Sequence, residues 1–172
     1  MLLSEINGLS SDKLNYRIID DRDRLALKEI LKDKEVCEPA GFKVIDDEMF
    51  PYFFNTFTEE GKAIGLFRDK QLVGYFRIND YVLDSGEYKD TNNISVGFCV
   101  GKDYQRNGYG SEALIFITKF LKQEYDHVFA DHFKENIACQ RTILKAGYKY
   151  FDEYTMYFRG LGQEKTVESY VY

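Results

Sequence analysis

The chain has 172 residues, a formal net charge of −6 and 44% hydrophobic residues, among them 14 Phe and 14 Tyr. This length predicts one domain spanning residues 1–172, and the composition is sufficient for a sizeable core and excludes a disordered chain. The acidic balance argues against nucleic acid as a partner and favours cationic substrates.

The cysteine pattern and the hydropathy narrow the class of protein further. Cys37, Cys99 and Cys139 lie far apart without a CxxC pair, which predicts neither a disulfide framework nor a zinc site. The chain does not start with a basic segment and a long apolar run, and no stretch approaches the length of a membrane span. We therefore expect a cytoplasmic protein in a reducing compartment, with no metal and no membrane partner.

The first half of the chain predicts three strands and two helices. The strands are expected over residues 14–19, 63–67 and 72–78, of which the last two form a hairpin. Asp20 and Asp21 offer a cap for a helix that ends before Pro39 and Gly41. A second helix is expected over 46–57, and its Phe-rich face predicts core packing, although such residues can also wall a substrate cleft.

A strand expected over 94–100, after a polar loop at 84–92, has one bulky face and one nearly bare face. The bulky residues are Ile94, Val96, Phe98 and Val100, and the bare face carries Ser95, Gly97, Cys99 and Gly101. A bare face lets another backbone or an extended ligand come within hydrogen-bonding distance, and Gly97 is where we expect a bulge to open the sheet. Packing beneath a close helix would explain this strand equally well.

The turn Gln105–Ser111 is rich in glycine and leads into a helix expected over 111–122. Gly108 and Gly110 allow positive φ, so that successive amide groups can point at one spot. The helix terminus adds about half a positive charge, and Arg106 adds a full one. The pattern predicts a diphosphate site, whereas the polar residues of the helix, including Glu112, are expected to face solvent.

The last third of the chain predicts a strand over 127–133 and a helix that Asn136 caps and Gly147 ends. A strand from Tyr148 to Phe158 and a closing strand over 167–172 follow. Strands and helices in this order predict an α/β or α+β fold with helices on both faces of a sheet. The aromatic C-terminal segment is suited to pairing in a homodimer.

Two sequence elements together resemble a known family. The first is the run Gln105, Arg106, Asn107, Gly108, Tyr109 and Gly110; the second is Asn136, followed by a helix that closes in Gly147 and Tyr148. In this order they resemble the GCN5-related N-acetyltransferases (GNAT), and within them the ribosomal-protein N-terminal acetyltransferase branch, over residues 14–158. The resemblance implies a mixed, mostly antiparallel sheet that is splayed at its fourth strand.

The resemblance also implies acetyl-coenzyme A as the acetyl donor. Its pantetheine arm would lie along the central strand and its pyrophosphate on the glycine-rich turn. The implied cofactor-binding residues are Phe98, Cys99, Val100, Gln105, Arg106, Asn107, Gly108, Tyr109, Gly110, Ser111 and Asn136. Lys134, Arg141 and Lys145 are candidates for the outer phosphate, although a solvated helix face explains each of them as well.

The implied reaction is direct attack of a primary amine on the thioester within a ternary complex. A lysine-type amine has a pKa of about 10.4 and must lose a proton first, and a backbone amide of the central strand can polarise the carbonyl. The acceptor is a protein N-terminus or a small amine such as a polyamine or an amino sugar antibiotic. Its cleft is expected between residues 38–57 and the last hairpin.

Two candidate catalytic residues depart from the family's pattern. Many members of the branch have a Glu where this chain has Ser95, which we predict to order a water, with a more distant carboxylate as proton acceptor. On the leaving-group side the branch often has a Ser where this chain has Cys139, and the Tyr acid of other branches would fall at Ile143. Cys139 either hydrogen-bonds to the coenzyme sulfur or fills space. The carboxylates that remain open as proton acceptors are Glu87, Asp90, Asp131 and Glu153.

Other interpretations use the same residues differently. Cys139 with His127 or His132 would make a thiol nucleophile, and His132 is also a candidate proton relay. Gly108, Gly110 and Ala113 satisfy GxGxxA, which with Asp131 about 20 residues on would suit a dinucleotide. Because the Glu is missing, a non-catalytic protein that binds or senses acyl-coenzyme A is a third possibility.

Overall fold

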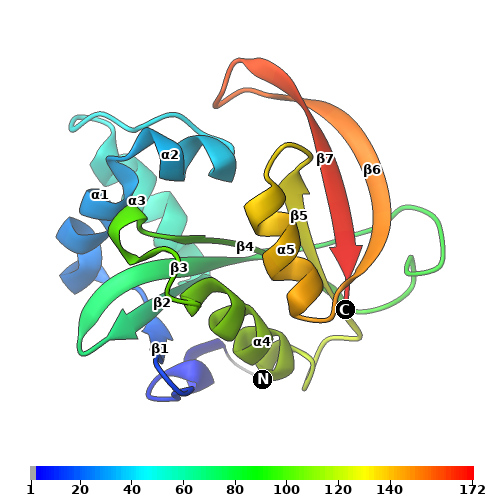
Figure 1. Ribbon diagram of the computed structural model, residues 1–172, viewed down its shortest axis with the longest axis horizontal. Coiled ribbons are helices and arrows are strands. Elements are labelled where there is room, and N and C mark those ends of the chain that lie inside the picture. Colours follow the sequence, from blue (N-terminus) through cyan, green and yellow to red (C-terminus); the bar gives the residue numbers. More distant parts are fainter. Residues whose placement is uncertain (1–2) are drawn as a thin grey trace.

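The computed structural model describes residues 3–172, which form a seven-stranded sheet with helices on both faces (Figure 1). The strands are β1 (Asn15–Ile18), β2 (Ala63–Arg68), β3 (Gln71–Asp80), β4 (Asn93–Val100), β5 (His127–Phe133), β6 (Lys149–Phe158) and β7 (Gln163–Val171). The α-helices are α1 (Arg24–Leu31), α2 (Lys34–Cys37), α3 (Phe50–Thr58), α4 (Tyr109–Leu121) and α5 (Ile137–Lys145).

The strand order is β1-β2-β3-β4-β5-β7-β6, and every neighbouring pair is antiparallel except the parallel pair β4 and β5. The predicted mixed, mostly antiparallel sheet is confirmed. Because β7 lies between β5 and β6, the aromatic C-terminal segment that we expected to pair between subunits already pairs on both sides within the chain. None of the helices in residues 3–172 has the length and hydropathy to span a membrane.

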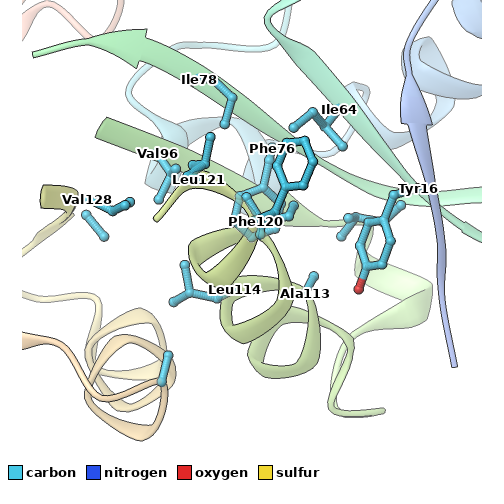
Figure 2. Packing of buried hydrophobic residues seen from close by; sticks show 14 of the residues in the cluster. Tyr16, Ile64, Phe76, Ile78, Val96, Ala113, Leu114, Phe120, Leu121 and Val128 are labelled. Carbon is cyan, nitrogen blue, oxygen red and sulfur yellow. The ribbon is translucent and has the colours of Figure 1, made fainter. Parts of the chain in front are cut away.

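The two faces of the sheet carry separate hydrophobic clusters. Figure 2 shows one of them, where Phe76 and Val96 of the sheet lie over Ala113 and Leu114 of α4. The other cluster joins α1 and α3 to the opposite face, with the Tyr75 ring edge-on to Phe57 at 4.8 Å. Because side chains alternate along β3 and β4, each strand contributes residues to both hydrophobic clusters. Helices pack over both faces of the sheet and cover these clusters.

The first predicted helix is two helices in the structure. Asp20 caps the short 3-10 turn Asp21–Asp23, so that α1 begins at Arg24. The chain leaves helical geometry at Asp33 (φ −93°, ψ 122°), whose side chain accepts a hydrogen bond from the Glu35 amide and so caps α2. The break follows from the tendency of a short carboxylate to bond to nearby backbone amides.

Two further helices start at other residues than predicted. Helix α3 begins at Phe50 instead of residue 46, because the Asp46 side chain accepts from the Met49 amide in a preceding turn and Pro51 suits a first helical turn. Helix α4 begins at Tyr109, two residues before the predicted start at Ser111.

The Glu112 side chain does not face solvent as expected. One of its oxygens accepts hydrogen bonds from the Ser11 hydroxyl at 2.5 Å and from the Lys13 amide at 2.7 Å. Glu112 thus ties the segment before β1 to the first turn of α4.

The sheet opens at β4, but not through a bulge. The register between β3 and β4 is continuous from Asp80 and Ile94 to Gly74 and Val100, so the bulge expected at Gly97 is absent. The parallel ladder between β4 and β5 instead ends at Val96 and Ala130. From there β5 continues beside β7 while β4 stays beside β3, which confirms the predicted splay at the fourth strand.

Candidate active site

A cavity of about 980 Å³ lies where β4 and β5 part, and residues from the early helices and the last hairpin complete its wall. Twelve of the thirteen predicted site residues line it, and Asn107 does not. The twelve are Ser95, Phe98, Cys99, Val100, Gln105, Arg106, Gly108, Tyr109, Gly110, Ser111, Asn136 and Cys139.

The free edge of β4 faces this cavity with unpaired backbone groups. Gly101 donates its amide to Val73 of β3 at 2.9 Å, and in an antiparallel pair alternate residues direct both their N–H and C=O groups to the same neighbour. The backbone N–H and C=O groups of Gly97 and Cys99 therefore bond to β3, whereas those of Phe98 and Val100 point into the gap between β4 and β5. The Gln105 side chain donates to the Val100 carbonyl at 3.1 Å, which fixes the turn to the end of β4.

The side chains around this edge leave its backbone accessible. The Phe98 ring stacks on Phe76 with centroids 5.0 Å apart, and Cys99 packs against the other core beside Tyr75. Apart from Gly97 and its two chain neighbours, no atom of residues 3–172 lies within 4 Å of the position that a Cβ would take at Gly97. A ligand in the gap could therefore contact the peptide groups of β4 directly, because no bulky side chain covers Gly97.

The turn after β4 presents a run of free backbone donors. Within residues 3–172, the six amides from Arg106 to Ser111 have no hydrogen-bond acceptor, and the first helical bond of α4 runs from the Glu112 amide to the Gly108 carbonyl. Arg106 (φ 64°) and Gly108 (φ 81°) both adopt left-handed backbone geometry. This conformation, next to a helix N-terminus, makes an anion-binding concavity.

Two of the predicted cofactor residues in this turn contribute backbone, not side chain. The Asn107 amide group donates to the carbonyls of Tyr104 and Gln105, which stabilises the turn. The Tyr109 side chain is buried in the core, where its hydroxyl accepts from Arg68 at 2.6 Å. Arg106, in contrast, is exposed at the cavity and adds a positive charge beside the free amides. The turn therefore fits a diphosphate.

The start of α5 forms another part of the wall. The Asn136 side chain accepts from the Cys139 amide at 3.1 Å and so caps this helix, as predicted. Burial raises the pKa of the Cys139 thiol to about 12, so that the thiol keeps its proton and can act as a weak hydrogen-bond donor.

The histidines do not make Cys139 a nucleophile. The ring of His132 donates from Nδ1 to the Phe133 carbonyl at 2.7 Å, and its Nε2 lies 3.3 Å from a Glu168 oxygen without hydrogen-bond alignment. His127 packs against the Tyr88 ring at 4.4 Å, away from the cavity. Neither ring hydrogen-bonds to the thiol within the described chain, and a protonated thiol is a poor nucleophile.

Among the four candidate proton acceptors, only Asp131 lines the cavity. It follows Ala130, the last β5 residue that pairs with β4. Its oxygens accept from the Ser169 hydroxyl at 2.6 Å and from the Tyr154 hydroxyl at 3.1 Å. Burial raises the pKa of Asp131, while these two hydrogen bonds act in the opposite direction.

The other candidate carboxylates and cations lie elsewhere. Glu153 pairs with Lys134 at 2.6 Å, which engages both of these side chains. Glu87 is exposed in the loop before β4, together with Asp90. The remaining candidates for the outer phosphate, Arg141 and Lys145, are exposed on α5.

Several polar residues that line the cavity were not predicted from the sequence, and two of them lie near Asp131 or Gly97. Arg77 of β3 and Tyr154 of β6 both line the cavity. The signal for Arg77 was an arginine within an otherwise apolar strand, whereas nothing marked Tyr154 among the tyrosines of the last hairpin. Ser95 lines the cavity as expected, and its hydroxyl makes a long hydrogen bond of 3.5 Å to the Asn79 carbonyl.

The fold limits the alternatives. A dinucleotide site of the GxGxxA type requires a doubly wound parallel sheet, and here only β4 and β5 are parallel. Residues 3–172 contain no group of three or more His, Cys, Asp or Glu side chains that could hold a metal ion. The geometry thus defines one cavity with the run of free amides and Arg106 at one end and a polar, aromatic-walled pocket at the other.

Comparison with known proteins names the class of protein. Residues 13–149 match the model of the acetyltransferase (GNAT) domain, and the chain therefore belongs to this family of acetyltransferases. The resemblance drawn from the two sequence elements is confirmed. No curated protein matches the sequence.

Solved structures share the fold at low sequence identity. An acetyltransferase of the GNAT family from Bacillus anthracis has a TM-score of 0.81 and 18% identity over 95% of this chain and 96% of its own. RimL, a ribosomal-protein alpha-N-acetyltransferase solved with coenzyme A in disulfide linkage to a cysteine, has a TM-score of 0.75 and 14% identity over 96% of each chain. The protein yncA from Salmonella typhimurium, solved with its cofactor acetyl-coenzyme A, has a TM-score of 0.66 and 15% identity over 94% of each chain.

Proposed function

We propose that the protein is an N-acetyltransferase that moves an acetyl group from acetyl-coenzyme A to a primary amine by direct attack in a ternary complex, with residues 1–172 as one catalytic domain. The observation that carries this proposal is the run of six free amides from Arg106 to Ser111, which follows the unpaired edge of β4; all of these residues except Asn107 line the same cavity as that edge. Each amide bond to a charged oxygen contributes about 1.5 to 3 kcal/mol, so three or four of them hold a diphosphate firmly.

These donors support the following proposed position for the cofactor. The free amides from Arg106 to Ser111, called the cradle, and the Arg106 side chain would bind the pyrophosphate, and the Phe98 carbonyl and the Val100 backbone would hydrogen-bond to the pantetheine arm along β4. Asn136 and Cys139 close the other side of the arm. The bound cofactor supplies an activated acetyl group as a thioester.

The chain's own residues carry the proton and charge movements of the transfer. Asp131 accepts the proton that the amine loses as its nitrogen bonds to the acetyl carbon, and Ser95 orders a water beside it. The Phe98 amide donates to the carbonyl oxygen on which charge develops. As the carbon–sulfur bond breaks, the Cys139 thiol donates a hydrogen bond to the leaving sulfur, which takes its proton from solvent.

Asp131 compensates for the missing glutamate of β4. It is a half-buried carboxylate with a raised pKa on the acceptor side of the cavity, which suits a proton acceptor. The cysteine joined to coenzyme A in the RimL structure is consistent with a thiol near the coenzyme sulfur. The activity of RimL on a ribosomal-protein N-terminus makes a protein N-terminus one acceptor to test beside small amines.

Calorimetry with acetyl-coenzyme A and an assay of thiol release with a panel of amines test the proposal. Binding of acetyl-coenzyme A together with amine-dependent thiol release is the expected result. Binding without turnover on any amine would indicate a non-catalytic acyl-coenzyme A sensor. If calorimetry detects no heat at millimolar acetyl-coenzyme A, both the acetyltransferase and the acyl-coenzyme A sensor are rejected.

A further inference from the structure

The acceptor side of the cavity carries two opposite charges. Among the charged residues that line the cavity, Arg106 belongs to the phosphate cradle, and Glu35 pairs with Lys102 at 3.0 Å. His132 faces the other side of the sheet, beneath α5, with its directly paired neighbour Glu168. Arg77 and Asp131 remain, a cation and an anion that face the acceptor side.

The strand register places these two charges on one row. Arg77 pairs with Gly97 in the ladder between β3 and β4, and directly paired residues share a face. Asp131 follows the last pair, Val96 and Ala130, and so stands on the level of Gly97 across the gap. Two strand spacings of about 4.8 Å put the backbones of Arg77 and Asp131 roughly 10 Å apart or more.

Between the two charges the row is open. Gly97 has no side chain, and in the described part of the chain no atom beyond its own neighbours lies within 4 Å of the position that a Cβ would take. Gly97 also adjoins Phe98, whose amide faces the gap where the acetyl group is proposed to lie. An amine over Gly97 would therefore have the acetyl donor on one side, Asp131 on the next strand, and Arg77 on the strand opposite.

Arg77 has donors to spare. Its Nη1 donates to the Ile78 carbonyl at 3.0 Å, and among residues 3–172 no carboxylate lies within ion-pair distance of it. By contrast, Arg17, also half-buried, forms a bidentate pair with Asp23 at 2.6 and 2.7 Å. A half-buried guanidinium with free donors facing a cavity is a ready partner for a carboxylate or another planar anion.

We infer that the acceptor is a small amine that also carries an anionic group, of the amino-acid type, with the anion on Arg77 and the amine over Gly97 beside Asp131. This inference rests on the proposed function and names its substrate class. Phe53, Phe57 and Met156 also line the cavity and provide an apolar wall for the body of such a molecule. A polyamine or an amino sugar would instead bring a second positive charge toward Arg77, which costs affinity.

Matched pairs of acceptors test the inference. Methionine, leucine and phenylalanine are compared with their carboxamides, and with spermidine, in the thiol-release assay. We expect kcat/KM to be at least tenfold higher for each free acid than for its amide, and lowest for spermidine. Arg77→Gln should remove this preference by lowering kcat/KM for the acids alone. The exposed Arg159, outside the cavity lining, gives the control Arg159→Gln, which should keep the preference.

A binding measurement separates this inference from the proposed function. Each acid and its amide are titrated by calorimetry into the wild-type protein saturated with coenzyme A, where tighter binding of the acids is expected. Equal kcat/KM for acids and amides, or faster turnover of spermidine, would overturn the inference and leave the proposed function intact. If no amine is acetylated, the proposed function fails, and equal binding of acid and amide would then overturn the inference as well.

Discussion

The Tyr154 hydroxyl on β6 reaches over the intervening strand β7 to donate a 3.1 Å hydrogen bond to the Asp131 carboxylate on β5. Ser169 of β7 donates to the other oxygen of the same carboxylate. Three strands thus hold Asp131 at the point where β4 and β5 part. A carboxylate with two hydroxyl donors is oriented but still has lone pairs with which to accept a proton.

Asp131→Asn should lower kcat for amine acetylation by about 100-fold or more, because a positioned general base contributes roughly 10² to 10⁴ in rate. The amide keeps the shape, its oxygen can accept from one of the two hydroxyls and its NH2 group can donate to the other, so binding of acetyl-coenzyme A should not change. Steady-state thiol release and calorimetry measure the two effects. Asp152→Asn, at an exposed carboxylate on β6, is the control and should leave kcat within a factor of two.

Tyr154→Phe should move the acidic limb of the pH–rate profile to higher pH. The Tyr154 hydrogen bond lowers the pKa of Asp131, so its loss raises that pKa further, and protonated Asp131 accepts no proton from the amine. Profiles of kcat/KM from pH 5 to 9 show the shift. An unmoved acidic limb in Tyr154→Phe would mean that another group titrates there.

Asp131 should also affect the pH dependence of folding stability. Its contribution should decrease as the pH rises, whereas that of most paired carboxylates increases. Its pKa is raised on folding, so the folded state binds more protons than the unfolded state between the ordinary carboxyl pKa and the raised one. The stability that it contributes is present below the ordinary pKa and is lost as pH rises through the raised value. We expect Asp131→Asn to have a higher Tm than the wild type at pH 7 and no such advantage near pH 4, as thermal unfolding at both values would show.

Gly110→Ala should weaken coenzyme A binding at least tenfold without destabilising the fold. A Cβ at this position would lie 3.7 to 3.9 Å from Val100, Phe98 and Thr142, which is ordinary contact, and alanine favours a helix by up to about 1 kcal/mol over glycine. The methyl group would, however, project among residues that line the cavity, beside the free amides of the turn. Calorimetry and thermal unfolding separate the effects.

The exposed position Lys119 on the same helix supplies the control for this substitution, since Lys119→Ala should leave coenzyme A affinity unchanged. If Gly110→Ala bound coenzyme A as tightly as the wild type, the phosphates would not lie against the first turn of α4.

Glu112→Ala should lower the free energy of unfolding by about 1.5 to 3 kcal/mol, the range for a hydrogen bond to a charged group. It removes the acceptor of both the Ser11 hydroxyl and the Lys13 amide, which frees the segment before β1 from α4. Urea unfolding measures the change. Glu29→Ala, which removes an exposed carboxylate paired only with exposed Lys32, should cost less than about 0.5 kcal/mol.

The strands and the glycine-rich turn after β4 could be predicted from the sequence because their signals are local. Alternation around Phe98 identified β4 and its two faces, and Gly108 and Gly110 identified the turn whose amides are free. The prediction of a bulge at Gly97 was wrong for a non-local reason. The sheet opens because β5 continues beside β7, and β7 lies at the C-terminal end of the chain.

The acceptor side was harder to predict for the same kind of reason. Arg77, Gly97 and Asp131 form a row only when the order of β3, β4 and β5 is known, since each belongs to a different strand. Asp131 therefore stood among four equivalent carboxylates in the sequence. Glu112 was assigned to solvent because its partner Ser11 is 101 residues away.

The divergence of β4 from β5 after Val96 leaves a slot inside the sheet itself, bordered by two backbones that would otherwise bond to each other. Such a slot admits a thin, unbranched chain with amide groups, which can take the place of the missing strand partner. Hydrogen exchange at the Phe98 and Val100 amides should therefore slow when such a ligand binds, because the ligand then takes the hydrogen-bonding position of a neighbouring strand.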